Sequence, residues 1–519
     1  MKNITKYLII VAGIVLGFAC VKEPTMSATE IEQRSLKAWI EKYHPELLEN
    51  YQEEGGYYVE ILDRGVQDSL PITGKDAWLW VDFTARDLQG NVCETRSWEL
   101  ALQQNTYNNH THYTPVFRFS GKDSHTLLEG SYLAIFNKLK IGDEEFEARY
   151  GTRLRLYLPS TVTSSNTGGT ADGGYEGQYE LDGDKPAIVD MMVYGHITNP
   201  VAYEGNRVDS FANINGGLCT EHKAEPKEDE ESAEKSMRRR ITRADSEEGE
   251  EEVDTRPLEF YDGRWHQPID TLAQLYVNYA YSPARNTFDY NAIGVDTLMY
   301  PSENGYDKGK IYGTSTLADI DRRINEALVE RFGEGISVDE VLEADSLNTK
   351  ATAKVWYIGR FLDGYVFDTN IDEVREIVFG DVGEAGEALS FETKEPLEND
   401  YILAWNYSLP TLRLGQWATI LTVSTYAYGI SGQVGAHTST TTGDTSAIDY
   451  ANYYNYMSYM NSMYGYGYGS MYNSGYYGYN PYYYGYNYVP SNTNTTTITT
   501  TATEIPSYSP MIFQVFVEK

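Results

Sequence analysis

The sequence predicts an α+β protein in which amphipathic helices alternate with antiparallel sheets. Apolar residues recur at helical spacing in 27–48 and 316–332, whereas 57–200 alternates apolar and polar residues between turn signals, as strands do. The order of helix, strand, Asp-Ser-Leu and aromatic strand also occurs twice, with the tripeptide at 68–70 and 345–347. An internal duplication is the economical explanation, and 519 residues are enough for two or three cores.

Both helices are expected to bury one apolar face. The first opens with an S-x-x-E capping box, and its face comprises Ile31, Leu36, Trp39, Ile40 and Tyr43. The face of the second helix comprises Leu317, Ile320, Ile324, Leu328 and Phe332.

The N-terminus predicts export and attachment to a lipid. Residues 1–19 hold a basic start, an apolar run too short to span a bilayer comfortably, and a small residue just before Cys20. This order resembles a bacterial lipoprotein signal, in which the cysteine carries lipid such as palmitate. Residues 21–23, Val-Lys-Glu, resemble the surface-export tag of some Bacteroidetes lipoproteins. We expect an outer-membrane location with a lipid anchor, in the periplasmic or the surface leaflet; a cleaved signal peptide and a membrane anchor are the alternatives.

The charge excludes nucleic acid as a partner. Lys and Arg number 41 against 76 Asp and Glu, and the net charge of −35 repels a phosphate backbone. Cys93 and Cys219 form no C-x-x-C motif, and His110 and His112 fit a surface loop better than a metal site. No metal and no cofactor are expected.

Composition divides the chain into six parts. The charged blocks at 223–257 contain no aromatic residue. They can bury too little apolar surface to offset the entropy lost on ordering, so this segment is predicted to be disordered. The tract 450–503 holds 17 tyrosines and no charged residue, a composition that is disordered yet adhesive. The expected parts are a signal peptide (1–19), a tether with an amphipathic helix (20–50), a β-rich domain (51–200), an acidic disordered linker (201–257), an unassigned β-rich segment (258–313) and a second domain (314–519) with a Tyr-rich insertion (430–504).

The second domain carries a spaced set of aromatic and acidic residues. Its first hairpin reads Val355, Tyr357, Gly359, an Asp-Gly turn at 363–364, and Phe367-Asp368. Trp405 then lies ten residues before Gly415, Gly415 lies thirteen before Tyr428, and Ile505 lies eight before Phe513. These matches resemble the FKBP-type peptidyl-prolyl cis-trans isomerases and cover most of 336–519, interrupted by 430–504.

The resemblance implies a fold and roles for these residues. The fold is a curved antiparallel sheet wrapped on a short helix near 405–413, with a proline slot between them. Trp405 would form the floor of this slot, and Ile505 belongs to the closing segment. The resemblance makes Tyr357, Phe367 and Phe513 the walls, gives the Ile402 N–H and the Tyr428 hydroxyl to substrate hydrogen bonds, and lets Asp368 orient Tyr357. Such a site needs no nucleophile, general base or metal.

The first domain keeps the sheet residues of the resemblance and loses the slot residues. Phe83 stands at the Tyr357 position, Ala85 at the Gly359 position and Cys93-Glu94 at the Phe-Asp pair. Tyr132 replaces the tryptophan, and Val189 replaces the phenylalanine of the closing segment. The first FKBP-like domain is therefore expected to be degenerate and non-catalytic.

Together these patterns predict a cell-envelope peptidyl-prolyl isomerase and chaperone. Its partners would be proline-containing polypeptide clients among exported or outer-membrane proteins, and an outer-membrane protein complex. The alternative is a non-catalytic surface lipoprotein that uses its FKBP-like domains and the Tyr-rich arm to bind protein or glycan. Ala404, where the family usually has glycine, and the long insertion favour this alternative.

Overall fold

The structure is a computed structural model. It describes residues 27–72, 77–90, 92–121, 125–163, 186–219, 258–269, 271–285, 288–290, 312–313, 315–380, 386–433, 435–441 and 496–519. The predicted signal peptide, Cys20, the charged part of the linker and most of the Tyr-rich tract lie outside these residues.

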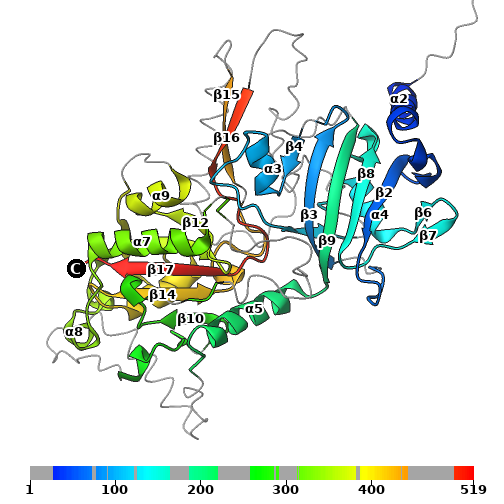
Figure 1. Cartoon of the computed structure of the whole chain (residues 1–519). Coiled ribbons are helices and arrows are strands. Elements are labelled where there is room, and N and C mark those ends of the chain that lie inside the picture. The colour runs from blue at the N-terminus through cyan, green and yellow to red at the C-terminus, as the bar shows by residue number, and fades with distance from the viewer. Residues whose placement is uncertain are drawn as a thin grey trace, which may run out of the picture.

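Two antiparallel sheets share one topology (Figure 1). The N-terminal sheet has the order β1-β2-β8-β9-β3-β4 with β5 beside β3, and the C-terminal sheet has the order β10-β14-β17-β11-β12 with β13 beside β11. The strands of the first are β1 Tyr51–Gln52, β2 Tyr57–Arg64, β3 Ala77–Asp87, β4 Val92–Thr95, β5 Val116–Ser120, β8 Thr152–Leu158 and β9 Ala187–Ile197. Those of the second are β10 Leu275–Asn278, β11 Thr352–Phe361, β12 Val366–Thr369, β13 Leu389–Glu392, β14 Trp417–Thr422 and β17 Met511–Val517. Two separate hairpins are β6–β7 (Leu139–Ile141 and Glu144–Phe146) and β15–β16 (Ala436–Thr441 and Thr496–Ala502).

The strand register confirms the internal duplication. Ala85 lies opposite Glu94 on one side and Val189 on the other. Gly359 lies opposite Asp368 and Phe513 in the same way. Both hairpins also shift register at the next residue, between 85 and 86 and between 359 and 360. The helix and antiparallel-sheet content confirms the α+β class.

The first helix, α2 Ala28–Tyr43, has the predicted capping box between Ser27 and Glu30. Its buried face is narrower than expected, because Leu36 and Ile40 are buried whereas Ile31 and Tyr43 are more than half exposed. The other α-helices are α3 Trp98–Gln103, α4 Glu129–Phe136, α5 Pro200–Ile214, α7 Leu317–Phe332, α8 Val338–Glu343, α9 Asp372–Phe379 and α10 Leu403–Ser408. Short 3-10 helices are η1 Pro45–Asn50, η2 Ser160–Val162, η4 Leu258–Tyr261, η5 Pro283–Arg285, η8 Leu347–Thr349, η9 Leu409–Thr411 and η10 Ser424–Tyr426. None of the described helices is long and apolar enough to cross a membrane.

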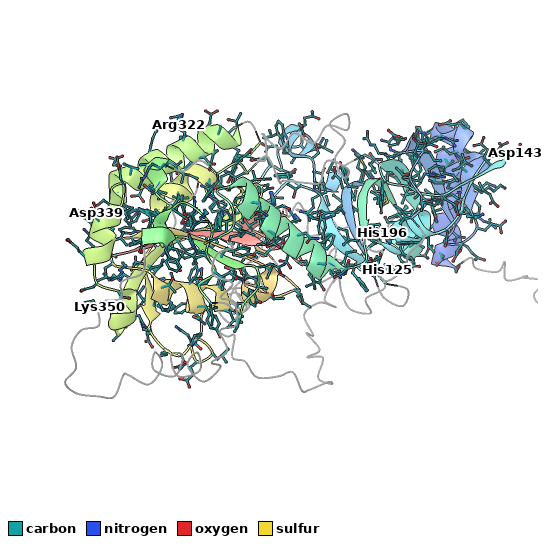
Figure 2. All side chains as sticks on the ribbon, turned by 90° about the horizontal axis from the view of Figure 1, so that it is seen from below. His125, Asp143, His196, Arg322, Asp339 and Lys350 are labelled. Atoms are coloured by element: carbon teal, nitrogen blue, oxygen red, sulfur yellow. The ribbon has the colours of Figure 1, made fainter. Side chains whose placement is uncertain are left out.

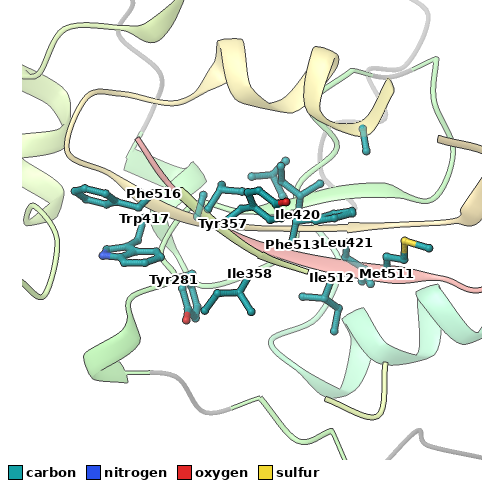
Figure 3. Close-up of a cluster of buried hydrophobic side chains, with 14 of the residues drawn as sticks. Tyr281, Tyr357, Ile358, Trp417, Ile420, Leu421, Met511, Ile512, Phe513 and Phe516 are labelled. Carbon is teal, nitrogen blue, oxygen red and sulfur yellow. The ribbon is translucent and has the colours of Figure 1, made fainter. Parts of the chain in front are cut away.

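The C-terminal sheet is covered on both faces. Tyr357 and Phe513 lie on one side of β11 and β17, whereas Tyr281, Ile358 and Ile512 lie on the other (Figure 3). Helix α7 lies over the second face (Figure 1). The predicted residues Leu317, Ile320, Ile324 and Leu328 of α7 are buried, while Arg322 projects outward (Figure 2).

A buried arginine joins α7 to this sheet. Arg360 has no exposed surface and lies 2.6 Å from the Asp321 carboxylate of α7. Its guanidinium also donates to the Gln514 side chain at 2.9 Å and to the Gly364 carbonyl at 2.8 Å. A buried charge is tolerated only when it is paired and hydrogen-bonded, so these partners fix α7 on the sheet.

One predicted segment boundary is wrong, and the segment left unassigned contributes a strand. Residues 201–214, expected in the disordered linker, belong to helix α5, whose Val208, Phe211 and Ala212 are buried. The charged blocks begin only after this helix. The unassigned segment 258–313 supplies β10, the edge strand of the C-terminal sheet, which pairs with β14. A strand of four residues is too short to be located by an alternation of apolar and polar residues.

The loop at 105–114 contacts the C-terminal sheet and its helix α9. His112 lies 2.7 Å from the Asp363 carboxylate, and the Tyr365 hydroxyl donates to the Asn109 carbonyl at 2.6 Å. His110 stacks on Phe379 with ring centroids 4.1 Å apart. Both histidines lie in a loop, as predicted, but the His112 side chain is only 12% exposed because it packs against the C-terminal sheet.

Asp82 on β3 should make the stability of the fold depend on pH. Burial raises the pKa of its carboxyl from 3.8 to about 6, although Arg96 and Arg153 act in the opposite direction. The folded state therefore binds a proton that the unfolded state does not bind between pH 4 and 6, so this group opposes folding above pH 6. We expect Asp82→Asn to stabilise the protein by roughly 1–2 kcal/mol at pH 7.5 and by little at pH 4. Urea unfolding at both pH values measures this difference, and an equal gain at both would contradict it.

Candidate active site

The β11–β12 hairpin positions three of the predicted site residues. The Tyr357 hydroxyl donates a 2.7 Å hydrogen bond to the Asp368 carboxylate. Phe367 lies across the strand at Gly359, where an added Cβ would come within 2.6 Å of its ring. The glycine is therefore required by the ring that covers it.

Helix α10 places Trp405 against the same face of the sheet. The ring centroid of Trp405 lies 4.9 Å from that of Tyr357 and 5.4 Å from that of Phe513, both in edge contacts. Phe367 continues the series, 6.0 Å from Phe513 and 5.9 Å from Tyr428. These five rings, which we call the ring set, form one continuous series of edge-to-face contacts, the arrangement that aromatic quadrupoles favour.

Direct contacts join seven of the eight predicted site residues, and the eighth, Ile505, lies in the same buried cluster. Ile505 is buried in the same hydrophobic cluster as the ring set, Ile402 packs against it, and Asp368 joins it through Tyr357. The rings of Tyr357, Phe367 and Trp405 are 5–7% exposed, and Phe513 is fully buried. Ile402, Asp368 and Tyr428 are partly exposed and form the accessible part of the site.

The backbone at the start of α10 carries a donor that the helix does not use. Ile402 is the N-cap residue, so its carbonyl accepts from the N–H groups of Trp405 and Asn406 at 3.0 and 3.1 Å. The N–H of an N-cap residue precedes the helical hydrogen bonds. This amide is therefore held in a fixed orientation beside the floor of the ring set.

Asp368 is the titratable group of the site. Burial raises the pKa of its carboxyl above the usual 3.8, while the Tyr357 hydroxyl and the Thr369 N–H oppose that rise by bonding to the charged form. Its carboxylate accepts the hydrogen bond of the Tyr357 hydroxyl, a charge-assisted contact that restrains the Tyr357 side chain. Among the described residues, no three His, Cys, Asp or Glu side chains gather in a way that could hold a metal ion.

Two segments lie beside the ring set, and we call residues 424–433 and 503–508 the flap arms. They are joined where Gln433 and Ile505 exchange two backbone hydrogen bonds of 2.8 Å. Gly432 has a φ of +70°, and an added Cβ would lie 2.0 Å from the Ile505 carbonyl oxygen, so only glycine fits there. The β15–β16 hairpin continues from these arms (Figure 1), and the rest of the predicted insertion lies outside the described residues.

The N-terminal sheet holds the counterpart of this site in altered form. Tyr132 of α4 is buried in the core of this part of the chain, and its correspondence to Trp405 stays a prediction. The buried His125, which the sequence analysis did not single out, stacks on Tyr132 with ring centroids 4.1 Å apart and planes 3° from parallel. Its ring also bonds to the Leu127 carbonyl and the Glu129 carboxylate, at 2.8 and 3.0 Å. Figure 2 shows His125 in the N-terminal part of the molecule.

The solved structures that are similar to this chain are FKBP-type isomerases. The three FKBP domains of wheat FKBP73 share 12% identity over 90% of this chain and 95% of that chain, with a TM-score of 0.18. FkpA from Escherichia coli shares 11% identity over 38% of this chain and 72% of that chain, with a TM-score of 0.20. A peptidyl-prolyl cis-trans isomerase from Pseudomonas syringae pv. tomato shares 15% identity over 33% and 98%, with a TM-score of 0.20. No family model and no curated protein matches the chain. Likeness at these TM-scores decides neither fold nor function.

Gly359 and Phe367 should be energetically coupled. We expect Gly359→Ala to destabilise the protein by about 1–3 kcal/mol, because its methyl group would push the Phe367 ring out of place. The N-terminal sheet combines Ala85 with Cys93 at these positions, so adding Phe367→Cys to Gly359→Ala should cost less than the sum of the two single changes. Urea unfolding of the double-mutant cycle measures this coupling. Strict additivity would show that the ring does not press on the glycine.

Proposed function

We propose that the C-terminal part of this chain is a peptidyl-prolyl cis-trans isomerase. The observation that carries the proposal is the ring set, with Trp405 at its centre and the Ile402 amide at its edge. Its residues come from β11, β12, α10, β17 and the flap arms, so only the folded chain assembles them.

The reaction suits an apolar site without acid–base groups. An X–Pro amide must twist through a barrier of about 18–20 kcal/mol, and the twisted amide is less dipolar than the planar one. Aromatic surroundings in place of water therefore favour the transition state over the ground state. In this proposal the proline ring packs on Trp405, between Tyr357 and Phe513.

Two donors at the accessible part of the site would hold the substrate. The Ile402 N–H would donate to a substrate carbonyl, and the Tyr428 hydroxyl would supply a second hydrogen bond. The Tyr357–Asp368 hydrogen bond would hold the Tyr357 ring in place while the substrate amide rotates. Because the rings are nearly buried, Tyr428 must move for a proline to enter.

Isomerase activity should depend on the face of the sheet that carries the ring set. In a protease-coupled assay with an X–Pro tetrapeptide, we expect Phe367→Leu to lower kcat/KM about tenfold, which corresponds to ~1.4 kcal/mol of transition-state stabilisation. Phe516→Leu is the matched control, since Phe516 is similarly buried but packs on Trp417 and Phe332 on the opposite face. It should leave kcat/KM within about twofold.

An inactive wild-type protein would favour the alternative of a non-catalytic binding lipoprotein. The near-complete burial of the ring set supports that alternative, because a closed slot has room for a ligand only after rearrangement. Isothermal titration with a proline-containing peptide separates the two functions: binding without turnover supports the second.

We further propose a chaperone role in the cell envelope. The support is the sequence alone: a signal of lipoprotein type at 1–20, and a Tyr-rich tract that fits loose capture of unfolded clients because tyrosine offers large contact area at low entropic cost. The alternative ligands of the tract are glycans, which bind by ring stacking. Deletion of 442–495 would leave tetrapeptide turnover intact and reduce binding of unfolded protein.

Lipidation at Cys20 should anchor the protein to the membrane. We expect Cys20→Ser to accumulate as unprocessed precursor, because lipoprotein signal cleavage requires the modified cysteine, and to lose its lipid. Metabolic labelling with an alkyne palmitate analogue and membrane fractionation measure both effects. Cys93→Ser, which keeps the signal, is the control and should be labelled like the wild type. Processed, membrane-bound Cys20→Ser protein would refute the lipoprotein interpretation.

A further inference from the structure

Both flap arms are bound by charged side chains from outside the C-terminal sheet. Glu504 forms ion pairs with Arg96, at 3.2 Å, and with Arg118, at 3.6 Å. On the other arm, the N–H and the hydroxyl of Ser424 both donate to the Glu204 carboxylate of α5, the hydroxyl at 2.9 Å. Each arm therefore has its own polar attachment to the N-terminal sheet or to α5.

These attachments are largely buried, so they constrain the arms. The Arg96 and Arg118 side chains are 6% and 7% exposed and Glu504 is 25% exposed, whereas Glu204 and Ser424 are each 1% exposed. Burying a charge is unfavourable unless a well-placed partner compensates it. Movement of either arm away from these partners would remove hydrogen bonds from buried charged side chains.

The internal duplication shows that the fold itself does not require the two arginines. Thr95 pairs with Thr84 as Thr369 pairs with Ile358, so the next residue, Arg96, corresponds to Asn370. Asn370 stays within its own sheet, where its side chain accepts from the Tyr357 N–H at 2.8 Å and donates to the Val355 carbonyl at 3.1 Å.

The second arginine has an apolar counterpart. Arg118 lies opposite Leu79 as Phe391 lies opposite Ala353. Phe391 is buried and packs on Tyr401. The C-terminal sheet thus forms with neither arginine, so the charges in the N-terminal sheet serve another purpose.

The arginines also lie where the N-terminal sheet has lost its slot residues. The Arg96 guanidinium lies 5.8 Å from the ring centroid of Phe83, the residue at the Tyr357 position. Glu94, at the Asp368 position, contributes a further negative charge to Arg96. The counterpart of the proline slot therefore contains a guanidinium group that binds the Glu504 carboxylate.

We propose that the N-terminal sheet and α5 are a structural part of the isomerase site, in which Arg96, Arg118 and Glu204 are positioning residues for the flap arms. Arg96 and Arg118 act through Glu504 on the neighbouring Ile505, which belongs to the same buried cluster as the ring set. Glu204 acts through Ser424 on Tyr428, which contacts Phe367. The claim that these residues position a catalytic site rests on the proposed isomerase function. The claim that they attach the flap arms does not depend on that function.

The neighbouring contacts agree with this role. Tyr508, at the end of the second arm, adopts a φ of +52° and sets its ring edge-on against Trp78 of β3, 5.0 Å away. Burial disfavours the charged form of Glu504, yet the two guanidinium groups outweigh it and hold the pKa of the carboxyl below its usual range. The second arm is therefore held at both Glu504 and Tyr508 under neutral conditions.

Hydrogen exchange on the full chain tests the attachment without reference to activity. We expect Glu504→Gln to speed amide exchange about tenfold in peptides containing Gln433 and Ile505, because local opening of their mutual hydrogen bonds becomes easier. Peptides from β11 and β17 should exchange as in the wild type. Arg96→Gln and Arg118→Gln should reproduce the effect, and Arg118→Lys should restore most of the protection.

Arg155→Gln is the matched control. Arg155 pairs with Asp190 at 2.5 Å in the same sheet, so its loss weakens an N-terminal ion pair without touching the arms. It should leave exchange at Gln433 and Ile505 unchanged. Equal exchange in Glu504→Gln and wild type, or equal acceleration by Arg155→Gln, overturns the attachment.

Turnover of the X–Pro tetrapeptide then tests the positioning role. Glu504→Gln should raise KM several-fold more than it lowers kcat, because the arms order the accessible part of the site. Unchanged kinetic constants alongside faster exchange overturn the positioning role. A wild-type protein without activity refutes the isomerase proposal and the positioning role with it, while the exchange result still decides whether the arms are attached.

Discussion

The register of the β11–β12 hairpin decides which side chains meet helix α10. With Gly359 opposite Asp368 and Phe513, the side chains of Tyr357 and Phe513 point to the helix, whereas Ile358 and Gln514 point to α7. A slip of one residue would exchange the two faces of the strand and carry Arg360 into the aromatic side. The bare backbone at Gly359 and the hydrogen bond from Tyr357 to Asp368 both favour the observed register.

Burial on both faces gives the C-terminal sheet a second constraint. Arg360 sits on the face opposite the ring set, where it pairs with Asp321 and donates a hydrogen bond to Gln514. Replacing such a pair by apolar residues often costs little, whereas removing one partner costs much. The pair therefore specifies how α7 docks more than it adds to stability, and a fixed α7 in turn keeps β11 rigid behind the ring set.

Local patterns in the sequence predicted the local structure well and the long-range contacts poorly. The capping box at Ser27, the apolar face of α7 and the paired hairpins follow from short-range spacing, and the registers confirm the duplication inferred from them. The eight site residues lie together as the family resemblance implies, although their roles stay predictions. Strand β10 is too short to show an alternation of apolar and polar residues. Helix α5 was missed because the charged residues that follow it dominate the composition of the predicted linker.

No local signal marks the contacts of Arg96, Arg118 and Glu204. Each side chain is typical of a solvated surface when read in its own segment, and its partner lies hundreds of residues away. Comparison of the two sheets supplies the missing signal, since Asn370 and Phe391 show what the same positions contain when no flap arm is bound. The burial of His112 against Asp363 escaped prediction for the same reason.

The position of β17 has a consequence for how the chain is made. This strand lies between β11 and β14, yet it follows the whole insertion in the sequence, so both neighbours have an unpaired edge until the last segment joins them. Exposed edges invite pairing with other chains, and contacts that span 408 residues, such as Arg96 with Glu504, form late. The N-terminal sheet is by then complete, because domains fold as they emerge. An incompletely folded chain would thus already contain the folded N-terminal sheet with Arg96 and Arg118, to which its last segment, with Glu504 and β17, binds at the end of folding.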